Sequence, residues 1–207
     1  MDMPAESPLS TEERIMLTAI DLMERKGFKA VTTKEIAHAS GFSEMTVFRN
    51  FGTKQNILER AFETYSNHID IEHEIKNKVE YNLFADLKKV AQVFQNYHAD
   101  NRKMFLIGFQ ERNTNPNLIY TMAENPRELK RFLIDYFEEM KKLGRVRTSI
   151  DSHAQAMNFL WMNLGHFFSG HIAGQNVAEK TVELDDFIEN AVEVFSYGLR
   201  PDCPDMK

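Results

Sequence analysis

Residues 44–50 combine hydrogen-bonding, basic and apolar side chains within two helical turns. At helical spacing, Val47 and Phe51 lie four residues apart and anchor one face to a core. The side chains left to face outward are Glu44, Met45, Thr46, Arg49 and Asn50. Arginine can donate two parallel hydrogen bonds to O6 and N7 of guanine, whereas threonine and methionine can contact the methyl group of thymine. Thr46 and Arg49 are the predicted base readers, with Thr46 also suited to a phosphate and Met45 to apolar contact with thymine.

Cap signals around this face indicate two short helices joined by a tight turn. Thr32 and Glu35 have the spacing of a capping box, and Ser43 is a good N-cap for the second helix. Gly41 is expected to take a positive φ angle in the turn, with Phe42 buried behind it. This order predicts a helix-turn-helix, which places its second helix in the DNA major groove; the alternative is an ordinary helical hairpin.

Hydroxyl and basic side chains near the two helices are predicted to contact DNA phosphates. Gly52 is expected to end the second helix, and Thr53 to cap a further helix that starts at Lys54 and offers its N–H groups. The residues positioned for phosphates are Thr33, Lys34, Ser43 and Lys54.

The net charge of −6 conceals an uneven distribution. Residues 25–60 carry seven basic and three acidic residues, whereas the segments on both sides are acidic. Attraction to DNA depends on the local face rather than on the total charge. The basic segment therefore coincides with the predicted helix-turn-helix.

Composition excludes several other classes of protein. The 207 residues contain one cysteine, Cys203, so no disulfide is possible within the chain, which suits a reducing cytosol and predicts a cytoplasmic location. The start lacks a basic segment followed by an apolar run, so no signal peptide is expected. No stretch approaches ~18 uninterrupted apolar residues, so no membrane span is predicted.

Helical periodicity without a convincing strand predicts an all-α fold of about nine helices. A capping box at Ser10 and Glu13 opens the first helix. The predicted organisation is a disordered tail (1–9), a helix-turn-helix domain (10–53), a connecting helix (54–76), a ligand-binding and dimerisation domain (77–200) and a second tail (201–207). Within the large domain, helices are expected near 83–99, 102–112, 117–124, 126–144, 151–171 and 185–199.

The helix over 151–171 is apolar almost all round, so it needs two packing partners. One face can be buried in its own domain. The other, with helix 185–199, would form a four-helix bundle with a second copy about a two-fold axis. Burial within a single chain is the alternative.

Sixteen Phe and eleven Met suit an adaptable apolar cavity between the helices of the large domain. The alternative for each residue is plain core. Gln110, Asn158 and His166 are candidates for its few polar groups. The predicted ligand-binding residues are Phe105, Phe109, Met122, Phe137, Met157, Asn158, Trp161 and Phe168.

No pattern indicates a metal, a cofactor or catalysis. His68 and Glu72 lie four apart, and His166 and His171 five apart, but neither pair has a third ligand at a recognisable spacing. There is no G-x-S-x-G, P-loop or H-E-x-x-H sequence either.

Residues 10–62 resemble the DNA-binding domain of the TetR family of bacterial repressors. The matching pieces are a first helix ending in Gly27 and Phe28, then V-T-T-K-E-I-A, S-G-F-S-E-M-T-V-F-R-N-F and T-K-Q-N-I-L. The family usually has Tyr where this chain has Phe48, and that hydroxyl commonly contacts a phosphate, so here the contact is lost or replaced. Phe48 is still expected at the DNA.

The resemblance implies a homodimeric regulator without enzyme activity, usually a repressor, that dimerises through its last two helices and contains a ligand cavity. Its expected partners are a double-stranded, roughly palindromic operator and a small apolar or amphipathic effector that lowers DNA affinity. The alternatives are an architectural DNA binder without an effector and a helical enzyme with an accessory helix-turn-helix.

Overall fold

A computed structural model describes residues 9–66, 68–171 and 182–201, except for the side chains of Ile119 and His171. These residues form eleven α-helices and one 3₁₀ helix, and no strand occurs among them, which confirms the predicted all-α fold. The predicted tails at 1–9 and 201–207, with Cys203, lie almost wholly outside the described residues. The chain divides into two compact units, Met1–Ser66 with Asn101–Thr121, and Asn67–Asp100 with Met122–Lys207.

The first unit is a helical bundle whose ends are set by side-chain caps. Ser10, Thr32, Ser43 and Thr53 each accept a hydrogen bond from the backbone three residues on, so the predicted N-caps are confirmed. Buried Ile15, Met23, Ile36, Ile57 and Phe62 hold the helices together. The helices are α1 (Thr11–Lys26), α2 (Thr33–Ser40), α3 (Glu44–Phe51), α4 (Lys54–Tyr65), α7 (Arg102–Gln110) and α8 (Pro116–Met122), whose last residue, Met122, belongs to the second unit.

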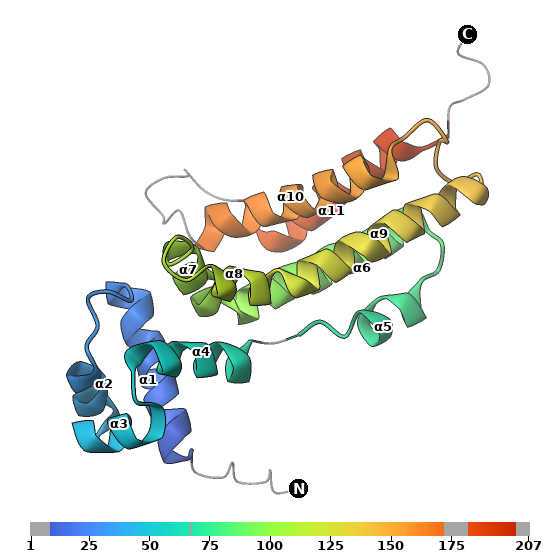
Figure 1. Ribbon diagram of the computed structural model, residues 1–207. Coiled ribbons are helices and arrows are strands. Elements are labelled where there is room, and N and C mark those ends of the chain that lie inside the picture. Colours follow the sequence, from blue (N-terminus) through green and yellow to red (C-terminus); the bar gives the residue numbers. More distant parts are fainter. Residues whose placement is uncertain (1–8, 67, 172–181, 202–207) are drawn as a thin grey trace, which may run out of the picture. The chain divides into compact units, whose positions relative to one another are not determined.

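The described residues of the second unit form four long helices and two short ones (Figure 1). Helix α10 packs on α9 and α6, and α11 packs on α6. The core includes Leu87, Phe94, Leu133, Phe137 and Phe159, all nearly inaccessible to solvent. The elements are α5 (Ile71–Glu74), η1 (Lys76–Lys78), α6 (Leu83–Asp100), α9 (Glu124–Lys142), α10 (Ser152–His171) and α11 (Leu184–Leu199).

The predicted continuous connecting helix over 54–76 is wrong. Helix α4 ends at Tyr65, and a short helix, α5, begins at Ile71. Asp70 is the N-cap of α5, and its side chain accepts a hydrogen bond from the N–H of His73. The backbone N–H of Ile69 donates instead to Oδ1 of Asn125 at 2.9 Å. The boundary predicted after residue 76 also differs from the observed division, because residues 101–121 group with the first unit.

His98 lies deep in the core of the second unit. His98 is 2% exposed, and its Nδ1–H donates to the carbonyl of Phe94 at 2.9 Å. The rings of Phe94, Tyr97 and Phe167 surround the imidazole, with centroids 4.1, 5.1 and 5.2 Å away. Burial lowers the pKa of His98 to about 4, because the charged form loses its hydration.

Acidification is therefore expected to destabilise the protein through His98. The unfolded chain takes up this proton near pH 6.5 and the folded chain only near pH 4, so stability present above pH 6.5 is lost as the pH falls towards 4. Between pH 7.5 and 5 the loss is about 2 kcal/mol. Urea unfolding at both pH values should show this difference in the wild type and not in His98→Gln. An exposed-site control, His153→Gln, should behave as the wild type; equal pH dependence in all three proteins would contradict the assignment.

Candidate nucleic-acid interface

The turn between α2 and α3 is built as the spacing predicts. Gly41 has φ +79° and ψ +23°, the left-handed conformation that a Cβ disfavours. Arg14 of α1 supports the turn, because its Nη2 donates to the carbonyl of Ser40 at 3.0 Å. The same guanidinium lies 4.9 Å above the ring of Phe42. Phe42 is only half-buried, so its predicted full burial is wrong and the arginine covers the remainder.

The predicted capping box of α2 forms only in part. The Thr32 hydroxyl accepts from the N–H of Glu35 at 3.1 Å. The Glu35 carboxylate, however, pairs with Lys26 of α1, and this hydrogen bond holds the pKa of Glu35 below its ordinary value. The side chain thus ties α2 to α1 rather than to its own N-terminus.

Helix α3 presents two opposed faces. Val47 and Phe51 are buried, at 1% and 5% exposure, as predicted. Glu44 and Arg49 are exposed, and Met45 and Phe48 are 66% and 65% exposed. Within the described part of the chain, Arg49 makes no hydrogen bond or ion pair, so its guanidinium is available to a partner outside the chain.

Two other side chains predicted to contact DNA, Thr46 and Asn50, already form hydrogen bonds within α3 and its N-cap. The hydroxyl of Thr46 lies 2.9 Å from that of Ser43, and both groups belong to the N-terminal cap. The Asn50 amide donates to the carbonyl of Thr46 at 2.7 Å. Thr46 and Asn50 are also half-buried, so they are less available to bases than Arg49.

The residues predicted to contact phosphates differ in whether their side chains already have a partner inside the chain. Lys34 is exposed and makes no ion pair within the described residues; Ser43 is exposed, and Thr33 is half-buried. Lys54 differs, because its ammonium donates to the carbonyls of Phe28 and Val31 at 2.5 and 2.6 Å and lies 4.2 Å from the Phe28 ring centroid. Burial lowers the pKa of Lys54, and the Glu111 carboxylate opposes that shift. Lys54 therefore holds the turn before α2.

Replacing Lys54 is expected to lower the free energy of unfolding and to have little effect on the salt dependence of DNA binding. Lys54→Met leaves the carbonyls of Phe28 and Val31 without their donor, at a cost of about 1–3 kcal/mol in unfolding free energy. Lys34→Met is the matched control and should leave stability within about 0.5 kcal/mol. Thermal unfolding of both variants checks this. If Lys54→Met unfolds as the wild type does while flattening the salt dependence of DNA binding, Lys54 is a phosphate ligand instead.

The predicted ligand-binding residues are divided between the two units. Phe105 and Phe109 lie on α7 of the first unit, and Phe109 is 41% exposed with the Arg112 guanidinium 4.8 Å above its ring. In the second unit, Met122 and Phe137 are buried in the core. Met157 and Phe168 of α10 are half-buried.

Asn158 and Trp161 do not line the interior of their own unit. Both are exposed on the outer face of α10, Trp161 at 64%. Of the predicted polar candidates, Gln110 is also exposed. His166 stacks on Phe187 with centroids 4.1 Å apart, and its Nε2 lies 2.9 Å from the Val182 carbonyl.

Two buried amide side chains of the second unit, Gln95 and Asn163, were not predicted from the sequence. Gln95 of α6 donates through Nε2 to the carbonyl of Asn163 at 2.8 Å, and both residues are nearly inaccessible. The Asn163 amide in turn donates to the carbonyl of Phe159 at 2.9 Å. Each lies at an inward position of an apolar helix, and this position was the one sequence feature that could have indicated a buried, hydrogen-bonded amide.

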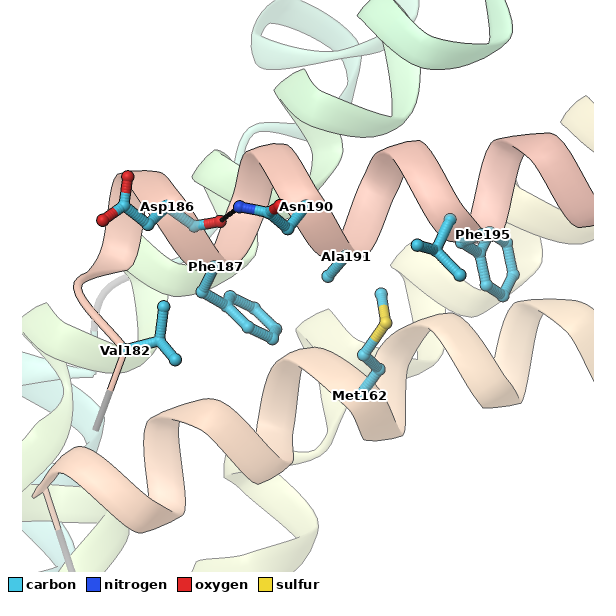
Figure 2. A pocket seen from close by; sticks show the side chains of 8 residues that line it. Met162, Val182, Asp186, Phe187, Asn190, Ala191 and Phe195 are labelled. Carbon is cyan, nitrogen blue, oxygen red and sulfur yellow. Dashed lines mark hydrogen bonds between the residues drawn. The ribbon is translucent and has the colours of Figure 1, made fainter. Parts of the chain in front are cut away.

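An open apolar groove of about 490 Å³ runs along α11 beside α10. Figure 2 shows Phe187, Ala191 and Phe195 of α11 on one side and Met162 of α10 on the other. The remaining lining residues are Val182, Asp186, Asn190 and Val194. Trp161, Val194 and Tyr197 are among the most exposed large apolar side chains of the described chain.

Two further findings concern metals and membranes. Across residues 9–66, 68–171 and 182–201, no three His, Cys, Asp or Glu side chains converge as a metal ion would require. His68 is hydrogen-bonded to Asn125, and His73 lies beside Glu74. No helix within these same ranges has the length and apolar character needed to cross a membrane.

Comparisons with known proteins agree with this geometry. Residues 15–61 match a family model described as bacterial regulatory proteins, tetR family. A curated relative from Bacillus subtilis (strain 168), the uncharacterized HTH-type transcriptional regulator YvkB, is 29% identical over 193 residues, or 93% of this chain and 98% of the relative.

Two solved structures share the fold over nearly their whole length. A bacterial regulatory protein of the tetR family from Rhodococcus RHA1 has a TM-score of 0.66 at 18% identity, covering 95% of this chain and 100% of that one. NalD, described as the secondary repressor of the MexAB-OprM multidrug efflux pump in Pseudomonas aeruginosa, has a TM-score of 0.62 at 14% identity, covering 93% and 97%.

Proposed function

Since the chain belongs to the tetR family of bacterial regulatory proteins and is a DNA-binding transcriptional regulator, we propose that it acts as a homodimeric repressor. A small apolar or amphipathic effector releases it from a palindromic operator. The observation that carries the proposal is the exposed face of α3, where Arg49 is unpaired within the described chain and Met45 and Phe48 face solvent. The description of NalD as a repressor supports repression over activation.

The outer surface of α10 and α11 supports a second copy of the chain as the dimer partner. On α11, Phe187, Ala191 and Val194 follow one another at four- and three-residue spacing, which forms one stripe. This stripe lines the groove that α11 forms beside α10, and its Val194 is 73% exposed. A matching pair of helices would cover the groove and complete a four-helix bundle.

Gly165 within α10 gives independent support for this partner. A Cβ built at Gly165 meets nothing within 4 Å, so the described residues give no steric reason for glycine there. Glycine inside a helix costs about 1 kcal/mol relative to alanine. A helix of the second copy approaching closely along α10 supplies the missing reason.

Two copies place two α3 helices on one duplex. Each would insert into the major groove, with centres about 34–36 Å apart, one helical turn of DNA. Because the dimer is two-fold symmetric, the operator half-sites are inverted repeats. Arg49 then contacts a guanine in each half-site through two parallel hydrogen bonds.

The effector part of the proposal is tested by a paired titration. Compounds from an apolar small-molecule set that raise the melting temperature are titrated into the free protein and into its operator complex. A regulatory effector should bind the complex more weakly by about 5–150-fold, a coupling of about 1–3 kcal/mol, and should weaken operator binding by the same factor. Equal affinities would mean that the compound occupies a site without regulating.

One alternative remains in the DNA-binding class. An architectural protein without an effector would bind duplexes of many sequences, and no compound would couple to that binding. The unpaired Arg49 beside exposed apolar side chains favours sequence reading instead. Enzymatic function is not a candidate, because the relatives are transcription regulators.

A further inference from the structure

Met45, Phe48 and Arg49 form one continuous stripe on the exposed side of α3. A helix advances by roughly 100° per residue, so Met45 lies between the other two, next to Phe48 one turn on and next to Arg49 on its other side. Met45 and Phe48 are 66% and 65% exposed, whereas Val47 and Phe51 on the opposite side are buried. The exposed stripe thus offers one guanidinium and two large apolar groups.

The hydrogen-bonding side chains on the other flank of α3 are not equally available. The hydroxyls of Thr46 and Ser43 are hydrogen-bonded to each other, and the Asn50 side-chain amide donates a hydrogen bond to the Thr46 carbonyl. Using either for a base would break a bond that stabilises the helix. The free readers of α3 are therefore Arg49, Met45 and Phe48, with Glu44 at the helix start.

The chemistry of the major groove determines what two apolar side chains can recognise there. Its base edges carry hydrogen-bond donors and acceptors, and the one apolar group is the 5-methyl of thymine. The unpaired cations Arg49 and Lys34 of the same unit favour a polyanion as the partner of this face rather than an apolar protein surface.

We propose that Met45 and Phe48 read thymine methyl groups next to the guanine bound by Arg49. The operator half-site is then a guanine with two neighbouring thymines on one side of it, and sequence preference is carried by apolar contact as much as by hydrogen bonds. This inference rests on the proposed function, because it specifies the DNA that the same α3 face binds.

Replacing thymine by deoxyuridine tests the inference, because the change removes only the methyl group. The intact wild-type chain first selects duplexes from a random-sequence library. In a selected duplex, each thymine is then replaced singly by deoxyuridine. One or two replacements per half-site should weaken binding about fourfold each, as expected for one buried methyl group at about 0.8 kcal/mol.

Side-chain variants assign each methyl to its reader. Met45→Ala should bind the thymine and deoxyuridine duplexes equally at one position, and Phe48→Ala should do so at the neighbouring one. Both positions are exposed, so folding is preserved. Leu143→Ala is the control, because it removes an exposed apolar side chain from the second unit, and it should keep the wild-type response at every position.

The outcomes separate this inference from the proposed function. Selection of a defined sequence that binds equally well with deoxyuridine throughout would overturn methyl reading and leave the regulator intact. Failure to select any sequence would overturn the proposed function itself. A deoxyuridine-insensitive protein whose oligomeric mass changes with Met45→Ala or Phe48→Ala would show a protein contact at this stripe, which also overturns the inference.

Discussion

Val194→Glu is expected to convert the proposed dimer into folded monomers. Val194 is 73% exposed on α11, so the substitution leaves the core of its own chain untouched. In the proposed dimer the same position is buried against the second copy, where an unpaired carboxylate costs several kcal/mol. Light scattering at micromolar concentration should give twice the chain mass for the wild type and a single chain mass for the variant.

Two further variants make this test specific. Thr148→Glu adds the same charge at an exposed position of the same unit and should remain dimeric. Phe159→Glu should instead unfold the second unit, because Phe159 is fully buried with its ring 5.3 Å from that of Phe195. A folded Val194→Glu protein that still has the mass of a dimer would exclude this face as the interface.

The fluorescence of Trp161, the one tryptophan of the chain, should report the dissociation of the proposed dimer. Trp161 is 64% exposed in one chain, on the outer side of α10, so it reports on the proposed interface rather than on an internal cavity. Its emission should shift to longer wavelength in Val194→Glu. Identical emission in wild type and variant would place Trp161 outside the interface.

Arg49→Ala is expected to weaken operator binding by about 1–3 kcal/mol, or roughly 5–150-fold, and to relax preference at one base pair per half-site. Stability should change little, because the guanidinium has no partner within the described chain. Competition binding against duplexes altered at each position measures both effects.

Arg60→Ala is the matched control for lost charge. Arg60 of α4 is exposed and pairs with Glu12, so its removal should leave base preference unchanged. If Arg49→Ala bound the operator as tightly and as selectively as the wild type, the assigned reading face of α3 would be wrong.

The helix-turn-helix was predictable because its determinants are local. Each of its N-caps depends on a hydroxyl and an N–H three residues away, and the turn depends on one positive φ at Gly41. Gly52 ends α3 as predicted. The competing partners of Lys54 and Glu35 could not be predicted, since the Lys54 contacts lie 23 and 26 residues away and that of Glu35 nine residues away.

The interruption after α4 had a local signal that helical periodicity concealed. Asp70 caps the N–H of His73, a helix start within the segment predicted as one helix. The other cause is tertiary, because Asn125 accepts the N–H of Ile69 from 56 residues away. A periodic pattern does not report such a partner.

The sequence could not assign the buried and exposed sides of α10, because this helix is apolar on both sides. Phe159 and Trp161 are two residues apart and therefore point in nearly opposite directions, one fully buried and the other exposed. Periodicity shows that such a helix has two apolar faces, but α6 and α9 decide which face enters the core. The sequence placed both residues correctly on a helix and could not assign their sides.

Selection of duplexes by the intact wild-type chain tests the central claim most directly. After several rounds against a random library, the bound sequences should share two inverted half-sites, each with a guanine, whose centres lie about 10–10.5 base pairs, or a multiple of this, apart. Two chains should bind each duplex. Enrichment of a single half-site bound by one chain, or no enrichment over the starting library, would contradict a dimeric regulator that reads DNA through α3.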